Sequence, residues 1–368
     1  MGPEKILYRF VFDGTLGIHK ARSRAIVEAT VAVTVADSVV PADIGRALAV
    51  DTTPKHGIKR IDRLLGNENL HGEIILIYSK YAKILIGPRP VILVDWSKLS
   101  GDHQAVISAS IVHKGRSIII YNEVHSMRLL ANPQIESRFI DNLHKYIVPE
   151  EAKPIIITDA GFRNPWFKKI LAKGWDFIGR TSLTPSIRKI DETEWKGASF
   201  YNDQKTHEAR DCGEVEIAKT NPLRTRLITI KDDPKKRKSN ARIGKKRISK
   251  NGHTANVYRK RYKNAALIIT SIRNLLSKSI YKLYSKRMQI EESFRAIKSS
   301  RFGYGQENTY ALKHKRLDVI FLLASLAMFV QILLGTLVEY FNLSKQFQSN
   351  TQSDKRAISI ARLGKLVA

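Results

Sequence analysis

The chain has 368 residues, which is enough for two or three domains with a substantial core. Apolar residues make up 43% of it and aromatic residues 8%, which excludes an intrinsically disordered chain. Lys and Arg number 63 against 34 Asp and Glu, so the formal net charge is +29. Because so many like charges repel one another, a polyanionic partner is expected, and we favour nucleic acid over a membrane. A single cysteine, Cys212, excludes an internal disulfide, and the first residues lack the apolar stretch of a signal peptide, so we expect a cytoplasmic protein.

Residues 1–86 are predicted to form an N-terminal helical DNA-binding domain. The clearest pattern is KHGIKRIDRLLGN, where Lys55, Lys59 and Arg63 recur every fourth residue and Arg60 extends the basic face. Ile and Leu residues occupy the other side of this helix. A basic face over an apolar face suits a small DNA-binding helix, and an ordinary solvated surface helix is the alternative.

Residues 87–180 are predicted to form the first part of an α/β core. VILVD (91–95) and PIIITD (154–159) are short apolar runs, typical of buried strands, and each ends in an acid. Between them, the runs 105–113 and 117–124 flank the turn Lys114-Gly115-Arg116 and predict a hairpin. Further elements are expected as helices at 134–147 and 164–174 and a strand at 175–180.

The order β-β-β-α-β-α-β, followed later by a helix, is typical of a ribonuclease-H-like mixed sheet with flanking helices. In that fold the first and fourth strands are parallel neighbours. Asp95 and Asp159 would then lie at the same edge, where open α/β sheets place their sites. Each acid alone has a structural alternative as a turn or cap residue.

Residues 181–265 interrupt this pattern with weaker, alternating strand signals and are predicted to form a basic, β-rich insertion. Tyr258 and Tyr262 lie within a run of Arg and Lys residues. Aromatic rings interleaved with basic residues suit nucleic-acid contact, and a solvated charged loop is the alternative.

The second part of the core is expected at residues 266–342 and contains YSKRMQIEESFRAIK, read as one helix. At about 100° per residue, Tyr284, Arg287, Glu291 and Lys298 share an arc of about 60°. An apolar seam runs beside that arc and predicts a core-facing side. A carboxylate flanked by cations suits a metal ion beside a nucleic-acid backbone, and a solvated, ion-paired helix face is the alternative.

The segment Val319–Val338 offers a competing interpretation, because its 20 residues carry no charge and are long enough to span a bilayer. Lys313, Lys315 and Arg316 precede it, as a cytoplasmic flank would. A helix buried in a large domain has the same composition.

Asp95, Asp159 and Glu291 offer the hard oxygen ligands that Mg²⁺ prefers. Two Mg²⁺ ions, with Mn²⁺ able to substitute, would activate the attacking oxygen and stabilise the leaving oxygen of a phosphoryl transfer. Arg287 and Lys298 would hold phosphates. The sequence has no Cys and His cluster for zinc, no HExxH, no G-x-S-x-G and no Walker loop.

The spacing Tyr284-x2-Arg287-x3-Glu291-x6-Lys298 resembles the Y-R-E-K signature of DDE transposases of the insertion-sequence-four family. VDWS around Asp95, TDAGFRNPWF around Asp159 and the N-terminal basic helix are similar to that family as well. The resemblance therefore extends over most of the chain.

This resemblance implies cut-and-paste DNA transposition by a homodimer that binds the terminal inverted repeats and target DNA. Asp95, Asp159 and Glu291 would be the metal-binding triad. The residues implied to contact DNA are Tyr284, Arg287, Lys298 and Arg163. The apolar helix packs inside such proteins, so no membrane is expected, and the protein would work in a bacterial cytoplasm near the nucleoid. An inactive or truncated DNA-binding relative, a structure-selective nuclease and a membrane-anchored basic protein are the alternatives.

Two departures from the family pattern stand out. No Trp precedes the strand AALIITS, so hairpin formation by base flipping is not expected by analogy. The tail 343–368 is short, and if C-terminal helices are missing, dimerisation would suffer while the triad stays intact.

Overall fold

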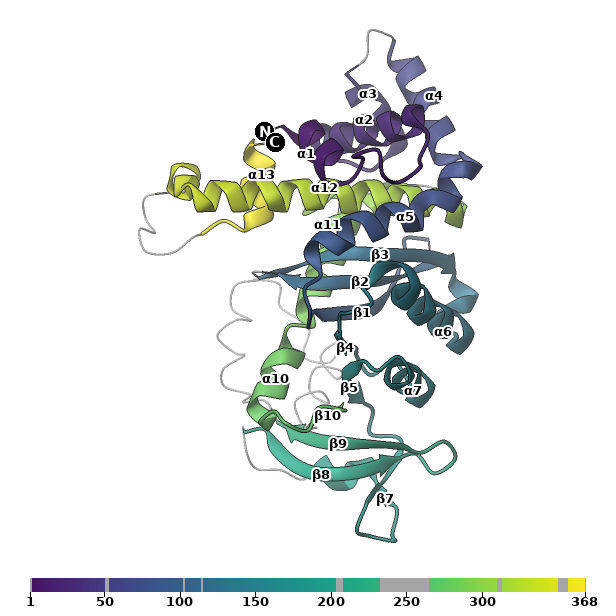
Figure 1. Ribbon diagram of the computed structural model, residues 1–368, viewed down its shortest axis with the longest axis vertical. Helices are drawn as coiled ribbons and strands as arrows, with labels where there is room; N and C mark the ends of the chain where they lie inside the picture. Colours follow the sequence, from purple (N-terminus) through teal and green to yellow (C-terminus); the bar gives the residue numbers. More distant parts are fainter. Residues whose placement is uncertain are drawn as a thin grey trace, which may run out of the picture. The chain divides into compact units, whose positions relative to one another are not determined.

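The computed structural model describes residues 2–49, 53–101, 103–113, 115–202, 208–231, 265–309, 313–349 and 357–367 (Figure 1). The chain divides into two compact units. The first unit contains residues 1–152 and 288–368, and the second contains residues 153–287. These two units differ from the five segments expected from the sequence. The boundaries of those five segments stay a prediction.

Helices begin the first unit, as the sequence predicts for this region. Proline occupies the first turn of α1, α3 and α4, where its missing N–H costs nothing, and the Asn67 side chain caps α5 by accepting a hydrogen bond from the Leu70 amide at 2.9 Å. The helices are α1 (Pro3–Phe10), α2 (Lys20–Ala36), α3 (Pro41–Ala47), α4 (Pro54–Leu65) and α5 (Glu68–Leu85).

Helices α3 and α4 cross at unusually close range through two glycines. A Cβ atom placed on Gly57 would lie 2.1 Å from the carbonyl oxygen of Gly45, and one on Gly45 would lie 2.5 Å from the Cα of Ile58. Only glycine allows this approach, so these two positions fix how α4 is presented.

Three antiparallel strands follow as a meander: β1 (Val91–Lys98), β2 (Gln104–His113) and β3 (Arg116–Ser126). The predicted hairpin is confirmed, with His113 paired to Arg116 and Gly115 at a φ of 81°. Strand β1 runs three residues beyond the predicted VILVD, because Trp96, Ser97 and Lys98 continue the ladder with β2.

Helices cover this meander. The predicted helix 134–147 is present as α6 (Pro133–Asn142), continued by a π-helical turn, Leu143–Ile147. Helices α5, α11 (Met288–Lys298) and α12 (His314–Tyr340) all contact β3. Short elements complete the unit: η1 (Met127–Leu129), η5 (Gln306–Asn308), η6 (Leu343–Phe347) and α13 (Ile360–Val367).

Helix α12 contains the apolar segment that suggested a membrane span. It is the one single helix in the described part of the chain that is long and apolar enough to cross a bilayer, and 89% of its most apolar window is buried inside the protein. It packs against α2, α5, α13 and β3 of the same unit. Its apolar surface therefore belongs to the core of the first unit.

The strands of the second unit follow the order β4-β5-β10-β9-β8-β6-β7. Strands β4 (Ile155–Ile157) and β5 (Asp176–Thr181) are parallel and joined through α7 (Asn164–Ala172), as predicted. The insertion is β-rich as expected, and its strands extend this sheet in antiparallel fashion. The remaining elements are β6 (Ser186–Lys189), β7 (Lys196–Gly197), η3 (Ala198–Asn202), β8 (Arg210–Ile217), β9 (Leu223–Ile230), β10 (Ala266–Thr270) and α10 (Ser277–Ser285).

Candidate active site

Asp95 lies on β1 directly after three fully buried residues, Ile92 to Val94. Its Oδ1 accepts a hydrogen bond of 2.8 Å from the amide of Trp96. The Trp96 side chain is held in turn, because its Nε1 donates to Glu136 Oε1 at 3.1 Å and its ring lies 5.9 Å from that of His125. Glu136 is only 6% exposed, so the backbone beside Asp95 is fixed from the interior of the unit.

Glu291 and Lys298 lie on α11, which is fastened to the sheet at two points. Lys298 Nζ donates to Ser97 Oγ at 3.0 Å and to the carbonyl of Lys98 at 2.7 Å, both at the end of β1. Ser293 Oγ donates to the carbonyl of Ser117 on β3 at 3.0 Å. Burial lowers the pKa of Lys298, while the negative charge of Glu307 raises it. Glu291 itself is exposed.

The expectation of one continuous helix from Tyr284 to Lys298 is wrong. Helix α10 ends at Ser285 and α11 begins at Met288. The amides of Lys286 and Arg287 bond to the carbonyls of Leu283 and Tyr284, three residues back, and these tighter bonds close α10. The arc of about 60° calculated for a straight helix therefore does not describe Tyr284 and Arg287 relative to Glu291. The two compact units also divide at this break.

In the second unit, Asp159 follows β4 and is partly exposed. Its Oδ1 accepts the amide of Gly161 at 2.7 Å, and a Cβ on Gly161 would come within 3.0 Å of the same oxygen. A glycine therefore fits best at position 161, because it lets the chain turn tightly around the Asp159 carboxylate.

Tyr284 is the centre of a charged cluster in the second unit. Burial raises the pKa of its hydroxyl, the nearby positive charges of Arg287 and Arg180 lower it, and the Asp159 carboxylate raises it. Arg287 is 9% exposed and also forms a hydrogen bond with the Tyr284 side chain. The cluster thus brings together one acid, two guanidinium groups and a phenol.

Arg180 was not expected from the sequence. It lies on β5, two residues beyond Ile178, which pairs with Ile157 of β4. Continuing this parallel register places Arg180 beside Asp159. The sequence does show a basic residue at the end of the strand WDFIGR. Its position beside Asp159 can be inferred only once the register between β4 and β5 is known.

Arg163 is exposed at the start of α7 and lines a pocket of about 580 Å³. On α4, Lys55, Lys59 and Arg63 are exposed, and their contact with DNA stays a prediction. Arg60 is half-buried and forms an ion pair with Glu28 of α2, so it ties two helices together. The predicted contacts Tyr258 and Tyr262 lie outside the described residues.

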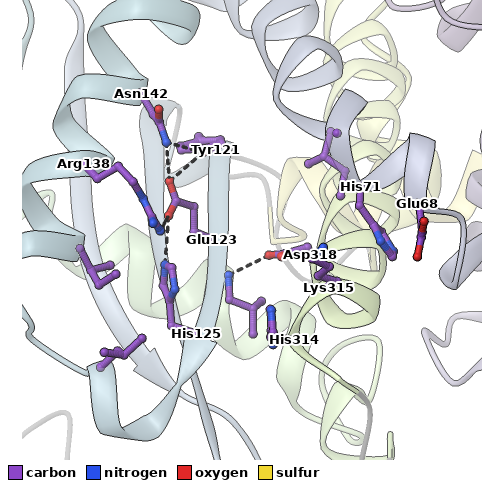
Figure 2. Close-up of a pocket in the computed structure, with 15 residues that line it drawn as sticks. Glu68, His71, Tyr121, Glu123, His125, Arg138, Asn142, His314, Lys315 and Asp318 are labelled. Carbon is purple, nitrogen blue, oxygen red and sulfur yellow. Dashed lines mark hydrogen bonds and ion pairs between the residues drawn. The ribbon is translucent and has the colours of Figure 1, made fainter.

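A polar pocket of about 620 Å³ in the first unit was also not expected. Figure 2 shows one wall formed by Tyr121, Glu123, His125, Arg138 and Asn142, facing His71, His314 and Asp318. Burial would raise the pKa of Glu123, but hydrogen bonds from His125, Asn142 and Tyr121 bring it down to about 2. Burial raises the pKa of Asp318 to about 8, and the Glu123 charge acts in the same direction, although Asp318 accepts the amide of Val124 at 2.7 Å.

A magnesium site needs oxygen ligands, and the three predicted carboxylates have the right chemistry. In the parts of the chain that the structure describes, however, no three His, Cys, Asp or Glu side chains gather closely enough to hold a metal ion. Asp95 and Glu291 belong to the first unit and Asp159 to the second.

The mixed α/β architecture, with acids following buried strands, is compatible with a ribonuclease-H-like domain. Residues 87–328 match the family described as a transposase DDE domain, and this match covers more than half of the chain. The protein therefore belongs to the DDE transposase domain family, whose members act on DNA. A search of curated proteins finds no match.

Proposed function

We propose that this protein is a cut-and-paste DNA transposase of the insertion-sequence-four type, in which Asp95, Asp159 and Glu291 together form the metal-binding triad. The observation that carries the proposal is the Tyr284 cluster, where Arg287 forms a hydrogen bond with the phenol and the charges of Arg180 and Asp159 also act on it. Two guanidinium groups next to an acid suit a scissile phosphate, because Arg binds phosphate oxygens in a bidentate manner.

The carboxylates would hold two Mg²⁺ ions, or Mn²⁺ in their place, which supply charge stabilisation at the attacking and leaving oxygens. Arg287 and Arg180 would bind the phosphate, with the Tyr284 hydroxyl as a further hydrogen-bond donor. Lys298 holds α11 against β1 and so orients the helix that carries Glu291. The chemistry would be hydrolysis that releases a 3′-hydroxyl, followed by its attack on target DNA.

The same proposal assigns duplex DNA at the terminal inverted repeats to the basic face of α4, with Lys55, Lys59 and Arg63 as phosphate contacts. Arg163 would contact DNA from the second unit. A homodimer would bridge the two element ends, in a bacterial cytoplasm near the nucleoid. Short inverted repeats, if found on both sides of the gene, would be the natural substrate.

The catalytic role of Glu291 is tested by measuring how the variant Glu291→Gln cleaves and binds end DNA. We expect cleavage to be abolished and binding to stay nearly unchanged, because the substitution removes a ligand charge and keeps the shape of the side chain. Glu292→Gln is the matched control, since Glu292 is the next residue on α11 and pairs with Arg295 on the surface. Equal loss of cleavage and binding in Glu291→Gln would contradict the assigned role.

A DNA-binding relative without transposition activity is the second candidate, because within the described residues no group of three His, Cys, Asp or Glu side chains could hold a metal ion. Metal-dependent nicking of a terminal-repeat duplex by the wild-type protein separates the two. Strand transfer into a target plasmid further separates a transposase from a plain nuclease of the same fold.

A further inference from the structure

The first turn of α12 carries a basic group that the proposed function does not use. Lys313, His314 and Lys315 are exposed, although the helix that follows them is buried in the first unit. Within the described residues neither lysine forms an ion pair. Because α12 is a core helix, these cations do not serve as the flank of a membrane span and need another explanation.

Their position is fixed by the next residue, Arg316, which forms an ion pair with Asp62 near the end of α4. The guanidinium of Arg316 also covers Gly66, whose Cβ position would lie 3.3 Å from Arg316 Nη1. The start of α12 is therefore attached to the end of α4, within one compact unit.

The side of α4 that meets Arg316 is the basic side. On a helical wheel, Lys55, Lys59 and Arg63 lie within about 100° of Asp62, all on the same flank. All four side chains are exposed, and within the described residues the carboxylate of Asp62 is bonded to Arg316. The start of α12 therefore adjoins the basic face of α4, and Lys315 also lines the polar pocket of the first unit.

We propose that the start of α12 and the basic face of α4 form one continuous surface that binds the phosphate backbone of duplex DNA, with Lys313 and Lys315 as phosphate contacts. This inference rests on the proposed function. Exposed lysines in a row bind phosphates as point charges and release counterions, without reading sequence. The surface would lengthen the DNA segment bound by the first unit beyond α4.

The test is the salt dependence of DNA binding by the full chain. Affinity for a random-sequence duplex is measured over a series of KCl concentrations for the wild type and for Lys313→Gln/Lys315→Gln. Each lost phosphate contact lowers the slope of log K against log salt by about 0.9, so we expect a decrease of about 2 in magnitude. Affinity at low salt should fall equally for all DNA sequences, because phosphates carry no sequence information.

Lys83→Gln/Lys345→Gln is the matched control. It removes the same two charges from exposed positions in the first unit, at the last turn of α5 and beyond the far end of α12. Helix α12 alone is about 40 Å long, so Lys345 lies far from the proposed surface. We expect the control to keep the wild-type slope.

An unchanged slope in Lys313→Gln/Lys315→Gln, with wild-type cleavage of end DNA intact, would overturn the inference and leave the proposed function standing. Equal decreases in both double variants would also overturn it, since the effect would follow net charge alone. An alternative is that the wild type binds anionic phospholipid vesicles through this surface. Loss of vesicle binding in Lys313→Gln/Lys315→Gln, with an unchanged salt slope of DNA binding, would assign the surface to a membrane. A wild-type protein that neither binds nor nicks duplex DNA would contradict the proposed function itself.

Discussion

Lys298 Nζ lies 2.7 Å from the carbonyl oxygen of Lys98, so the last turn of α11 is tied to the end of the strand that carries Asp95. The sequence predicted Lys298 as a phosphate contact. In the structure its ammonium group bonds to protein oxygens from Ser97 and Lys98.

Lys298→Met should therefore destabilise the protein as well as slow cleavage. The substitution removes two hydrogen bonds from a charged donor, so we expect a loss of about 1–3 kcal/mol in the free energy of unfolding. Urea unfolding of the variant, with the exposed Lys345→Met as control, measures this. Unchanged stability together with weakened DNA binding would show that Lys298 serves the DNA instead.

Gly57→Ala should destabilise the contact between α3 and α4. The added methyl group would meet the carbonyl of Gly45, and such overpacking costs about 1–3 kcal/mol. Gly72→Ala on α5 is the control, because its Cβ position has no neighbour within 4 Å and alanine favours a helix. We expect the thermal midpoint to fall for Gly57→Ala and to rise slightly for Gly72→Ala. Equal midpoints would contradict the close crossing.

Asp318→Asn should change how stability depends on pH. The pKa of Asp318 is about 8 in the folded protein against an ordinary value of 3.8, so the folded state holds a proton that the unfolded state releases. Stability of the wild type should then fall as pH rises from about 4 to about 8. The Asn side chain is neutral and keeps an oxygen for the Val124 amide.

The variant should accordingly be more stable than the wild type above pH 8, with the difference shrinking towards pH 4. Urea unfolding at both ends of this range measures it. A constant offset between the two proteins across the range would show that Asp318 does not bind a proton as inferred.

Arg180→Gln should slow cleavage of end DNA, because it removes one of the two guanidinium groups near Tyr284. It should also weaken binding of the cleaved end more than binding of random duplex. Arg210→Gln, an exposed arginine on β8 of the same unit, is the control and should behave as the wild type. Cleavage at the wild-type rate would remove Arg180 from the site.

Removal of divalent metal with a chelator should abolish nicking of end DNA and leave binding largely intact, since the basic surfaces bind phosphates without a metal. Added Mg²⁺ or Mn²⁺ should restore nicking. Nicking that persists after chelation would contradict the proposed cofactor.

The strands that carry the acids could be predicted because each is an unbroken apolar run, such as the one before Asp159. The hairpin between them could be predicted because a turn with a glycine separates its two strands. The break between α10 and α11 could not, since neither Lys286 nor Arg287 is a helix breaker and the helix ends through bonds of shorter range. Arg180 and Asp318 were missed for a related reason. The role of Arg180 depends on the register between β4 and β5, and that of Asp318 on the edge of β3. Neither can be predicted from a local sequence pattern.

Strand β3 is the last strand of its sheet, and side chains bond to two of its backbone groups. The Val124 amide donates to Asp318, and the Ile119 carbonyl accepts the Tyr81 hydroxyl. The unpaired backbone groups of an edge strand can pair with a strand of another chain, and these two side-chain bonds hinder such pairing. Pairing of copies edge to edge through β3, and growth of a fibril from this side, is accordingly disfavoured.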